Sequence, residues 1–276
     1  MTQLLVSDFD RTLYRDGRIS DEDLSAVRDW QARGHLFAIA TGRDEQSIRE
    51  KLAEWKLPAD YYICNNGARI TNRSGELLSQ TSMDLKTVLS IADFLINQED
   101  LSAAVTIADT RFKLLSRTGK DGYPSLAEQI SLEDLRHKGA HILQLHCRCG
   151  SPPPAVLLSQ RINTLHRGIT AFANEWNVDI VNSSVDKGEA AEFLVHHLNG
   201  IERVITIGDS LNDRNMIQRF HGFTIETANQ AVKDIAALVY SSVAQCVKSE
   251  DGKTWSHIPP HYPLTPPAAI PSINWF

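Results

Sequence analysis

Short apolar segments alternate with helix-like segments near both ends of the chain, and this alternation constrains the fold more than any other feature. The apolar segments that we expect to form strands are residues 4–6, 35–40, 61–64 and 203–207. A helix is expected between the first two, because Ser20 can cap its beginning and Gly34 can end it. Strands that alternate with helices pair in parallel through right-handed crossovers. The sequence therefore predicts an α/β fold with a Rossmann-like parallel sheet.

The alternation is interrupted in the middle of the chain. Two apolar segments flank Asp109 and Thr110, and so short a connection predicts an antiparallel hairpin. Strand–helix alternation returns from Asp186, with helices expected over residues 187–198, 212–219 and 229–237. The expected organisation is a core of residues 1–79 and 184–258, an inserted α+β domain of residues 80–183, and a C-terminal tail of residues 259–276 that holds six of the eleven prolines.

The composition restricts the class of protein. The formal net charge of −6 argues against a nucleic-acid partner and against binding to an anionic membrane. No apolar stretch is long enough to span a bilayer. The four cysteines have no disulfide-type spacing, which favours a reducing compartment. We therefore expect a cytoplasmic protein whose partner is neither nucleic acid nor membrane.

Polar residues follow each apolar segment that is expected to join the parallel sheet. These polar segments are residues 7–12, 41–43, 65–67 and 208–213. In an open parallel sheet, ligands bind at the edge where the carboxyl ends of the strands lie. That edge is predicted to gather the carboxylates of Asp8, Asp10, Asp209 and Asp213.

Four carboxylates in one crevice repel one another, and a bound divalent cation relieves this repulsion. All-oxygen ligation favours Mg²⁺. Lys187 is expected in the first turn of a helix, where the helix dipole disfavours a cation, so its position favours a facing anion. Thr41 and the backbone amides of Gly42 and Arg43 can donate to phosphate at the start of the next helix. These residues together predict a phosphorylated ligand.

The same segments resemble the four ordered motifs of the haloacid dehalogenase-like hydrolases. The matching motifs are Asp8-Phe9-Asp10-Arg11-Thr12, Thr41-Gly42-Arg43, Lys187-Gly188 and Gly208-Asp209-Ser210-Leu211-Asn212-Asp213. The long insert and the sequence CNNGA at 64–68 resemble the Cof-type branch, which has a large α/β cap domain and includes sugar-phosphate phosphatases. The resemblance spans about residues 4–250 and implies a phosphatase that acts on a small phosphorylated metabolite.

The resemblance also implies a role for each matching acid. Asp8 is expected to be the nucleophile that forms an aspartyl-phosphate, and Asp10 the general acid and base. Asp8, the backbone carbonyl of Asp10, and Asp209 are expected to bind Mg²⁺. Asp213 is expected either to ligate the metal or to lie behind its ligands.

The remaining motif residues are expected to act on the phosphate or on the acids. Thr41 and Lys187 would hold the transferred phosphoryl group, and Asn212 would contact it. Thr12 would orient Asp10. Arg43 either contacts the substrate or pairs with a structural carboxylate, and the sequence leaves both possibilities open.

Less specific interpretations remain for several features. A phosphomutase, a catalytically idle sugar-phosphate-binding module, and an interaction protein that uses its proline-rich tail are the alternative functions. The alternation of residues 143–149 places Cys147 and Cys149 on the apolar face of a strand, which favours packing over zinc binding. Asn65 and Asn66 are interpreted equally well as a turn or as ligand-binding residues.

Overall fold

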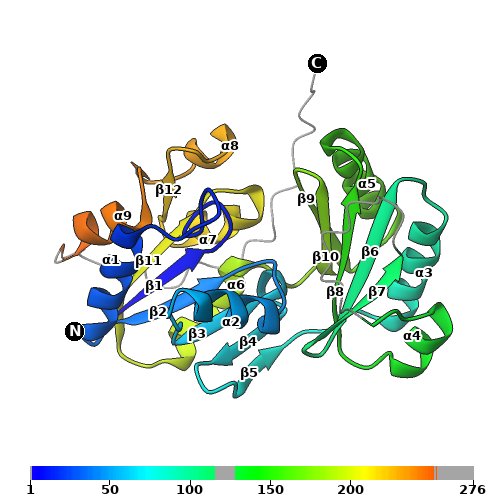
Figure 1. Ribbon diagram of the computed structural model, residues 1–276, viewed down its shortest axis with the longest axis horizontal. Coiled ribbons are helices and arrows are strands. Elements are labelled where there is room, and N and C mark those ends of the chain that lie inside the picture. Colours follow the sequence, from blue (N-terminus) through cyan, green and yellow to red (C-terminus); the bar gives the residue numbers. More distant parts are fainter. Residues whose placement is uncertain (1, 116–127, 252, 254–276) are drawn as a thin grey trace.

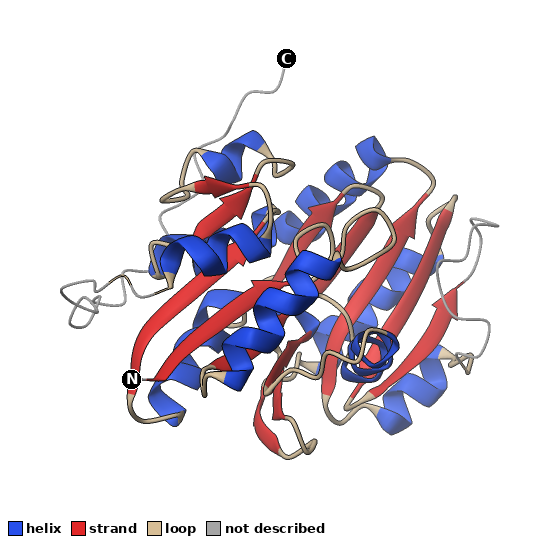
Figure 2. Cartoon of the chain, turned by 60° about the vertical axis from the view of Figure 1, so that its left-hand side comes forward, coloured by secondary structure: helices blue, strands red, loops and turns tan. Residues whose placement is uncertain are grey.

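The computed structural model describes residues 2–115, 128–251 and 253, and it contains two β-sheets that lie side by side (Figure 1). The first sheet has eight strands in the order β13-β12-β11-β1-β2-β3-β4-β5. The second has five strands in the order β7-β6-β8-β10-β9. Figure 2 shows the helices that pack around them. Within the described residues, no helix has the length and apolarity needed to cross a membrane.

The first sheet is parallel over most of its width. Its parallel strands are β1 (Thr2–Asp8), β2 (Leu36–Ala40), β3 (Tyr61–Cys64), β11 (Ile201–Gly208), β12 (Phe223–Ile225) and β13 (Val239–Tyr240). β1 lies in the middle, paired with β2 on one side and β11 on the other. Its residues Leu4, Leu5 and Val6 are fully buried because both faces of the sheet are covered. The predicted α/β fold with a parallel core sheet is confirmed.

One edge of this sheet departs from the prediction. β4 (Arg69–Asn72) and β5 (Leu77–Gln80) pair antiparallel with β3 and with each other. The sequence indicated no strands over these residues, so this antiparallel edge was not anticipated. The hairpin depends on a local turn, in which the Asn72 side chain accepts from the backbone of Ser74 and Gly75 adopts φ 90°. Its strands are short and lack the continuous apolar segments of the central strands, because they are only partly buried.

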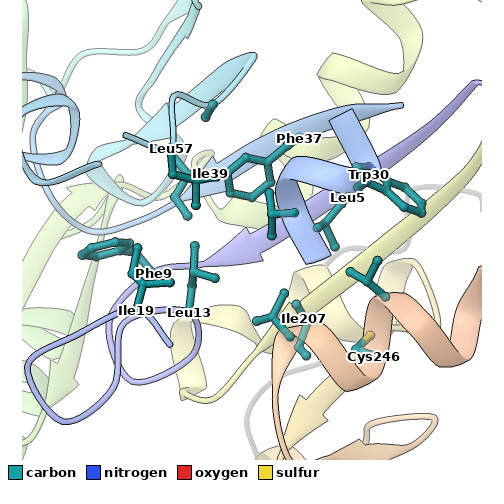
Figure 3. Close-up of a cluster of buried hydrophobic side chains, with 14 of the residues drawn as sticks. Leu5, Phe9, Leu13, Ile19, Trp30, Phe37, Ile39, Leu57, Ile207 and Cys246 are labelled. Carbon is teal, nitrogen blue, oxygen red and sulfur yellow. The ribbon is translucent and has the colours of Figure 1, made fainter. Parts of the chain in front are cut away.

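Helices cover the two faces of the first sheet with separate apolar clusters. The covering helices are α1 (Asp21–Ala32), α2 (Glu45–Glu54) and α9 (Val243–Glu250) on one face, and α6 (Lys187–His197) and α7 (Arg214–Arg219) on the other. Trp30 of α1, Phe37 of β2 and Cys246 of α9 meet in the first cluster (Figure 3). The predicted beginning of α1 is confirmed, since the Ser20 side chain accepts from the backbone of Asp23.

The second sheet is antiparallel. It consists of β6 (Leu101–Ile107), β7 (Thr110–Leu115), β8 (Ile142–Cys149), β9 (Ile169–Asn174) and β10 (Asn177–Asn182). The hairpin predicted around Asp109 is the connection between β6 and β7. The three helices α3 (Leu85–Ile96), α4 (Leu132–Lys138) and α5 (Pro152–Leu165) cover the face that points away from the first sheet (Figure 1). Cys147 and Cys149 are buried under these helices as free thiols, as predicted.

The C-terminal part of the core contains two further differences. The helix expected over residues 229–237 is limited to α8 (Gln230–Lys233), and α9 follows β13 where no helix was predicted. The segment 211–219 begins with the short 3₁₀ turns η2 (Leu211–Asp213) before α7. The proline-rich tail of residues 259–276 lies outside the described residues.

A buried carboxylate links α1 to α9. Asp23 of α1 is fully buried and accepts hydrogen bonds from Arg15 Nη2 at 2.6 Å and from the backbone N–H of Ala244 at 2.7 Å. We predict that Asp23→Ala lowers the free energy of unfolding by roughly 2–4 kcal/mol, because it leaves a partly buried guanidinium without its carboxylate partner and a buried N–H unpaired. Urea unfolding followed by circular dichroism measures this difference.

Asp21→Ala is the matched control, because Asp21 is an exposed acid in the same helical turn. It should change the free energy of unfolding by no more than about 0.5 kcal/mol. Equal effects of the two substitutions would show that the Asp23 contacts do not stabilise the fold.

Candidate active site

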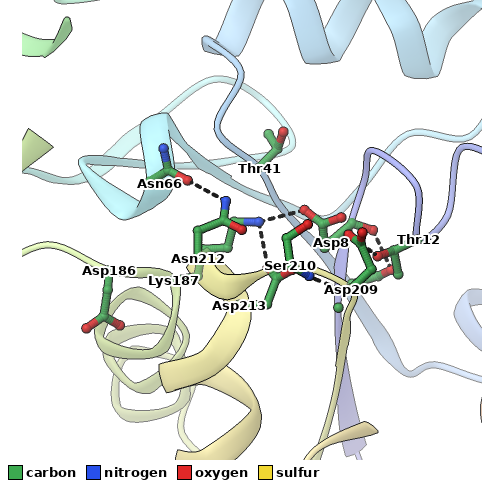
Figure 4. A network of polar contacts seen from close by, with 12 residues as sticks. Asp8, Thr12, Thr41, Asn66, Asp186, Lys187, Asp209, Ser210, Asn212 and Asp213 are labelled. Atoms are coloured by element: carbon green, nitrogen blue, oxygen red, sulfur yellow. Dashed lines mark hydrogen bonds and ion pairs between the residues drawn. The ribbon is translucent and has the colours of Figure 1, made fainter. Parts of the chain in front are cut away.

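The predicted site residues converge where four parallel strands end and α6 begins (Figure 4). Asp8 is the last residue of β1, Thr41 directly follows β2, and Asp209 directly follows β11. Lys187 is the first residue of α6. Segments almost 200 residues apart in the chain thus meet because the sheet places β1 beside β11.

A buried ammonium group joins two of the aspartates. Lys187 Nζ donates to Asp8 Oδ1 and to Asp213 Oδ1, each at 2.6 Å, and the lysine is only 1% exposed. Burial alone would lower the pKa of Lys187, but the carboxylates of Asp213 and Asp8 raise it above its usual value. Lys187 therefore stays charged, with these two acids as its partners in the structure. Its expected contact with phosphate stays a prediction.

Asp213 is fixed by the backbone around it. Its Oδ2 accepts from the N–H groups of Asp209 and Ser210, each at 3.0 Å. Gly208 allows this close approach, since a Cβ atom there would lie 2.5 Å from Asp213 Cγ. The carboxylate is held rigidly beside Lys187, at a position that only a glycine in the preceding strand can accommodate.

Three of the predicted metal ligands form one acidic group. Carboxylate oxygens of Asp8, Asp209 and Asp213 lie within 4.8 Å of one another, and all three residues are buried. Asp8 Oδ2 is buried without a hydrogen-bond partner. Burial and the charge of Asp213 raise the pKa of Asp8 well above its usual value and that of Asp209 to about 6. Crowded, partly unpaired oxygen ligands of this kind fit a hard divalent cation such as Mg²⁺.

The carboxylate of Asp10 lies outside that acidic group. Arg43 binds both of its oxygens, with Nε 2.8 Å from Oδ2 and Nη2 2.7 Å from Oδ1. The hydrogen bond to Asp10 raises the pKa of Arg43. Of the two possibilities left open for Arg43, the structure has the pairing with a carboxylate, and the carboxylate is that of the predicted general acid.

The remaining predicted residues line the same edge of the sheet. The Thr41 hydroxyl accepts from the backbone N–H of Arg43 at 3.1 Å, and Asn212 Nδ2 donates to Asn66 Oδ1 at 2.9 Å. Thr12 was expected to orient Asp10, but its hydroxyl donates to Asp209 Oδ1 at 3.3 Å. Thr12 thus contacts one of the predicted metal ligands, which the sequence motif did not indicate.

Residues of the second sheet also reach this edge, and the sequence analysis did not identify them. Asp179 of β10 accepts from Asn66 Nδ2 at 3.0 Å, and Gln144 of β8 donates to the carbonyl of Gly42 at 3.1 Å. Arg11 contacts Asp209 and Glu175, which lies in the turn between β9 and β10. The available signal was the polar face of the predicted strand that contains residues 143–149, opposite its apolar residues. That alternation shows a polar face but not what it meets.

A family model, curated relatives and solved structures each match most of this chain. A sequence model of the haloacid dehalogenase-like hydrolases matches residues 5–246. An uncharacterised protein of Mycoplasma capricolum subsp. capricolum is 28% identical over 241 residues, which cover 80% of this chain and 89% of the relative. The HMP-PP phosphatase of Klebsiella pneumoniae is 25% identical over 229 residues, with coverage of 79% and 81%. Among solved structures, a subclass IIB sugar phosphatase matches with a TM-score of 0.74 and 18% identity, over 90% of this chain and 97% of its own. At this identity, the match shows a shared fold.

The raised pKa of Asp209 has a consequence for stability. Between its ordinary value near 4 and its folded value of about 6, the native state binds more protons than the unfolded chain, so the contribution of this group to stability is lost as the pH rises through 6. We predict the following for the free energy of unfolding in EDTA. The difference between Asp209→Asn and the unaltered protein shifts in favour of the variant by about 2–3 kcal/mol from pH 4 to pH 7.5. Urea unfolding at several pH values measures this difference.

Asp21→Asn, which removes an exposed charge, should show no such trend. A difference between Asp209→Asn and the unaltered protein that is independent of pH would contradict the assignment of a raised pKa to this carboxyl.

Proposed function

The chain belongs to the family of haloacid dehalogenase-like hydrolases, and on this premise we propose that it is a Mg²⁺-dependent phosphatase of small phosphorylated metabolites, such as sugar phosphates. Phosphatases among its named relatives and structural neighbours support the reaction class. The observation that carries the proposal is the pairing of Lys187 with Asp8 beside the unpaired Asp8 Oδ2, because it combines a fixed cation with an available oxygen nucleophile.

We propose that Asp8 attacks the phosphorus atom of the bound ester. A bond forms between a carboxylate oxygen of Asp8 and phosphorus while the bond from phosphorus to the ester oxygen breaks. Lys187 and the donors around Thr41 balance the charge on the transferring phosphoryl group. Asn212, which lies on the same side as Lys187, is proposed to contact this group as well.

Asp10 is proposed to move the proton in both halves of the reaction. It protonates the departing alkoxide, and as a carboxylate it then takes a proton from the water that attacks the aspartyl-phosphate. Phosphate leaves and the Asp8 carboxylate is restored. Because Arg43 donates to both of its oxygens, Asp10 is proposed to part from Arg43 before it acts as the acid.

Mg²⁺ would be held by Asp8, Asp209 and the backbone carbonyl of Asp10, with Asp213 either as a ligand or behind the ligands. When bound, it supplies positive charge that screens the carboxylates from the anionic substrate and stabilises the negative charge of the transferring group. The acidic group supports this assignment through its crowding and its unpaired oxygen.

The second sheet is proposed to belong to a cap domain of residues 80–183 that closes over the core formed by residues 1–79 and 184–258. The two connections between them lie together, since Asn182 Nδ2 donates to the carbonyl of Ser82 at 2.9 Å. Connections that run side by side allow one domain to move as a unit. A cytoplasmic location remains part of the proposal and follows from the charge and the cysteines.

The first test is phosphate release from p-nitrophenyl phosphate by the purified protein with Mg²⁺. We predict that Asp8→Asn lowers kcat by roughly a thousandfold or more, because it removes the attacking charge and preserves the shape of the side chain. Excess EDTA should also abolish activity, and Mg²⁺ should restore it. Full activity of Asp8→Asn, or activity that persists after chelation, would refute the proposal, and Asp21→Asn serves as the control that keeps activity.

The second test concerns the proton donor. An aryloxide leaves without protonation, whereas an alkoxide needs a proton. We predict that Asp10→Asn lowers kcat/KM for glycerol 3-phosphate at least about tenfold more than for p-nitrophenyl phosphate. Equal losses on both esters would show that Asp10 is not the general acid.

A further inference from the structure

Three polar residues on the second sheet form a bonded group, which we call the Asp179 cluster: Gln144, His146 and Asp179. Asp179 lies opposite His146 in the pairing of β10 with β8, and Gln144 is two residues before His146 on the same face. Asp179 Oδ1 contacts His146 Nδ1 at 2.6 Å and accepts from Gln144 Nε2 at 3.0 Å. The neighbouring residues Val178 and Ile180 point into the apolar core under the helices, so the cluster faces the first sheet.

The cluster contacts the loop that is proposed to bind phosphate. Asp179 Oδ2 accepts from Asn66 Nδ2 at 3.0 Å, and Gln144 Nε2 donates to the carbonyl of Gly42 at 3.1 Å. A Cβ atom on Gly42 would lie 2.6 Å from Asp179 Oδ2, so no side chain separates the carboxylate from this loop. Asn66 in turn accepts from Asn212 (Figure 4). The carboxylate of Asp179 therefore lies against Gly42, in the segment that is proposed to bind phosphate.

Several buried polar atoms in and near these contacts have no hydrogen-bond partner. They are Gln144 Oε1, Asn212 Oδ1 and both side-chain polar atoms of Asn65. These residues are buried or partly buried, and a buried polar group without a hydrogen bond is costly. Three of the unpaired atoms, Gln144 Oε1, Asn212 Oδ1 and Asn65 Oδ1, are acceptors, so a ligand that fills this region is favoured when it brings hydroxyl or amino donors.

The charges around the cluster disfavour a second anion. Burial would raise the pKa of Asp179, but the hydrogen bonds from His146 and Asn66 bring it below its usual value, so this carboxylate is ionised. Burial lowers the pKa of His146, and the charge of Arg111 lowers it further, so the imidazole is neutral near pH 7. The net charge of the cluster is therefore negative.

The arginines nearby are already paired with carboxylates. Within the described part of the chain, Arg43 binds Asp10, Arg11 binds Asp209 and Glu175, and Arg111 lies 3.6 Å from Asp44. A phosphate or carboxylate on the far end of a substrate would have to displace one of these acids and would still face Asp179. A neutral or amine-bearing group meets no such cost.

We propose that Asp179, positioned by Gln144 and His146, is the residue that makes this site select phosphate monoesters whose organic part carries hydroxyl or amino groups and no second negative charge. The inference rests on the proposed phosphatase function and extends it from the reaction to the chemical class of the substrate. Asp179 acts by accepting hydrogen bonds from the organic part and by repelling a second anion.

The experiment uses pairs of esters that differ only in one charged group. Glucitol 6-phosphate and 6-phosphogluconate have the same carbon chain, with a hydroxymethyl group in one and a carboxylate in the other. Glycerol 3-phosphate and 3-phosphoglycerate form a shorter pair of the same kind. The measured quantity is the ratio of kcat/KM for the neutral member to that for the carboxylate member, on the full-length protein with Mg²⁺.

The unaltered protein should favour the neutral member of at least one pair by about tenfold or more, which is the scale expected for like charges a few ångströms apart near a protein surface. Asp179→Asn preserves the shape and removes the charge, and Asp179→Ser removes the charge and shortens the side chain. Both should reduce the ratio at least about fivefold. Asp93→Asn is the control, because Asp93 is an exposed acid of α3 whose loss changes the charge of this part of the chain equally.

The possible outcomes separate this inference from the proposed function. If the unaltered protein hydrolyses none of these esters and no p-nitrophenyl phosphate, the phosphatase proposal fails and the inference fails with it. If it hydrolyses p-nitrophenyl phosphate but prefers the carboxylate members, or if both Asp179 variants keep the original ratio, only the inference is overturned. An equal change in Asp93→Asn would assign the selectivity to overall charge and would likewise overturn it.

Discussion

The site depends on one buried cation, the ammonium group of Lys187. It lies between Asp8 at the end of β1 and Asp213 after β11, in a position that is almost inaccessible to solvent. Three buried aspartates would repel one another without it, and an unpaired lysine at this depth would lose its charge. Each charge is tolerable only because the others are present. The repulsion that remains among these carboxylates favours the binding of a second cation.

The backbone keeps these charges at fixed positions. Parallel pairing places β1 beside β11, so that Asp8 and Asp209 follow neighbouring strands. Asp186 caps α6 by accepting from the N–H groups of Gly188 and Glu189, which fixes the turn from which Lys187 extends. Gly188 is needed at this close packing, since a Cβ atom there would lie 2.9 Å from the backbone of Asn215 in α7. Catalytic geometry that rests on strand ends and packed helices requires little reorganisation when a substrate arrives.

The fold and the site could be predicted from the sequence where the determining information is local. The ends of the central strands are marked by apolar residues followed by polar ones, and the cap at Ser20 is a three-residue pattern, so the parallel core and the meeting of Asp8, Lys187, Asp209 and Asp213 could be anticipated. The pairing of β4 and β5 could not, because their burial is partial and their direction is set by a turn at Gly75. Side-chain partners across sheets were also beyond the sequence. Nothing in the motifs indicates that Arg43 binds Asp10 or that Asp179 reaches Asn66, since each contact depends on how two distant segments are placed in space.

The junction between the two sheets differs in character from the cores on either side of it. A small apolar cluster, which includes Ala68, Leu143 and Val181, lies there, and the contacts around it are polar. Those polar contacts involve residues of the candidate site. Asp179 accepts from Asn66, Gln144 donates to Gly42, and Arg11 contacts both Asp209 and Glu175. Apolar packing would hold the sheets together whatever the site contained, whereas hydrogen bonds and ion pairs to site residues change when a cation or an ester changes the charge there. We therefore expect the position of the second sheet to depend on what the site holds, because its contacts at the junction include residues of the site.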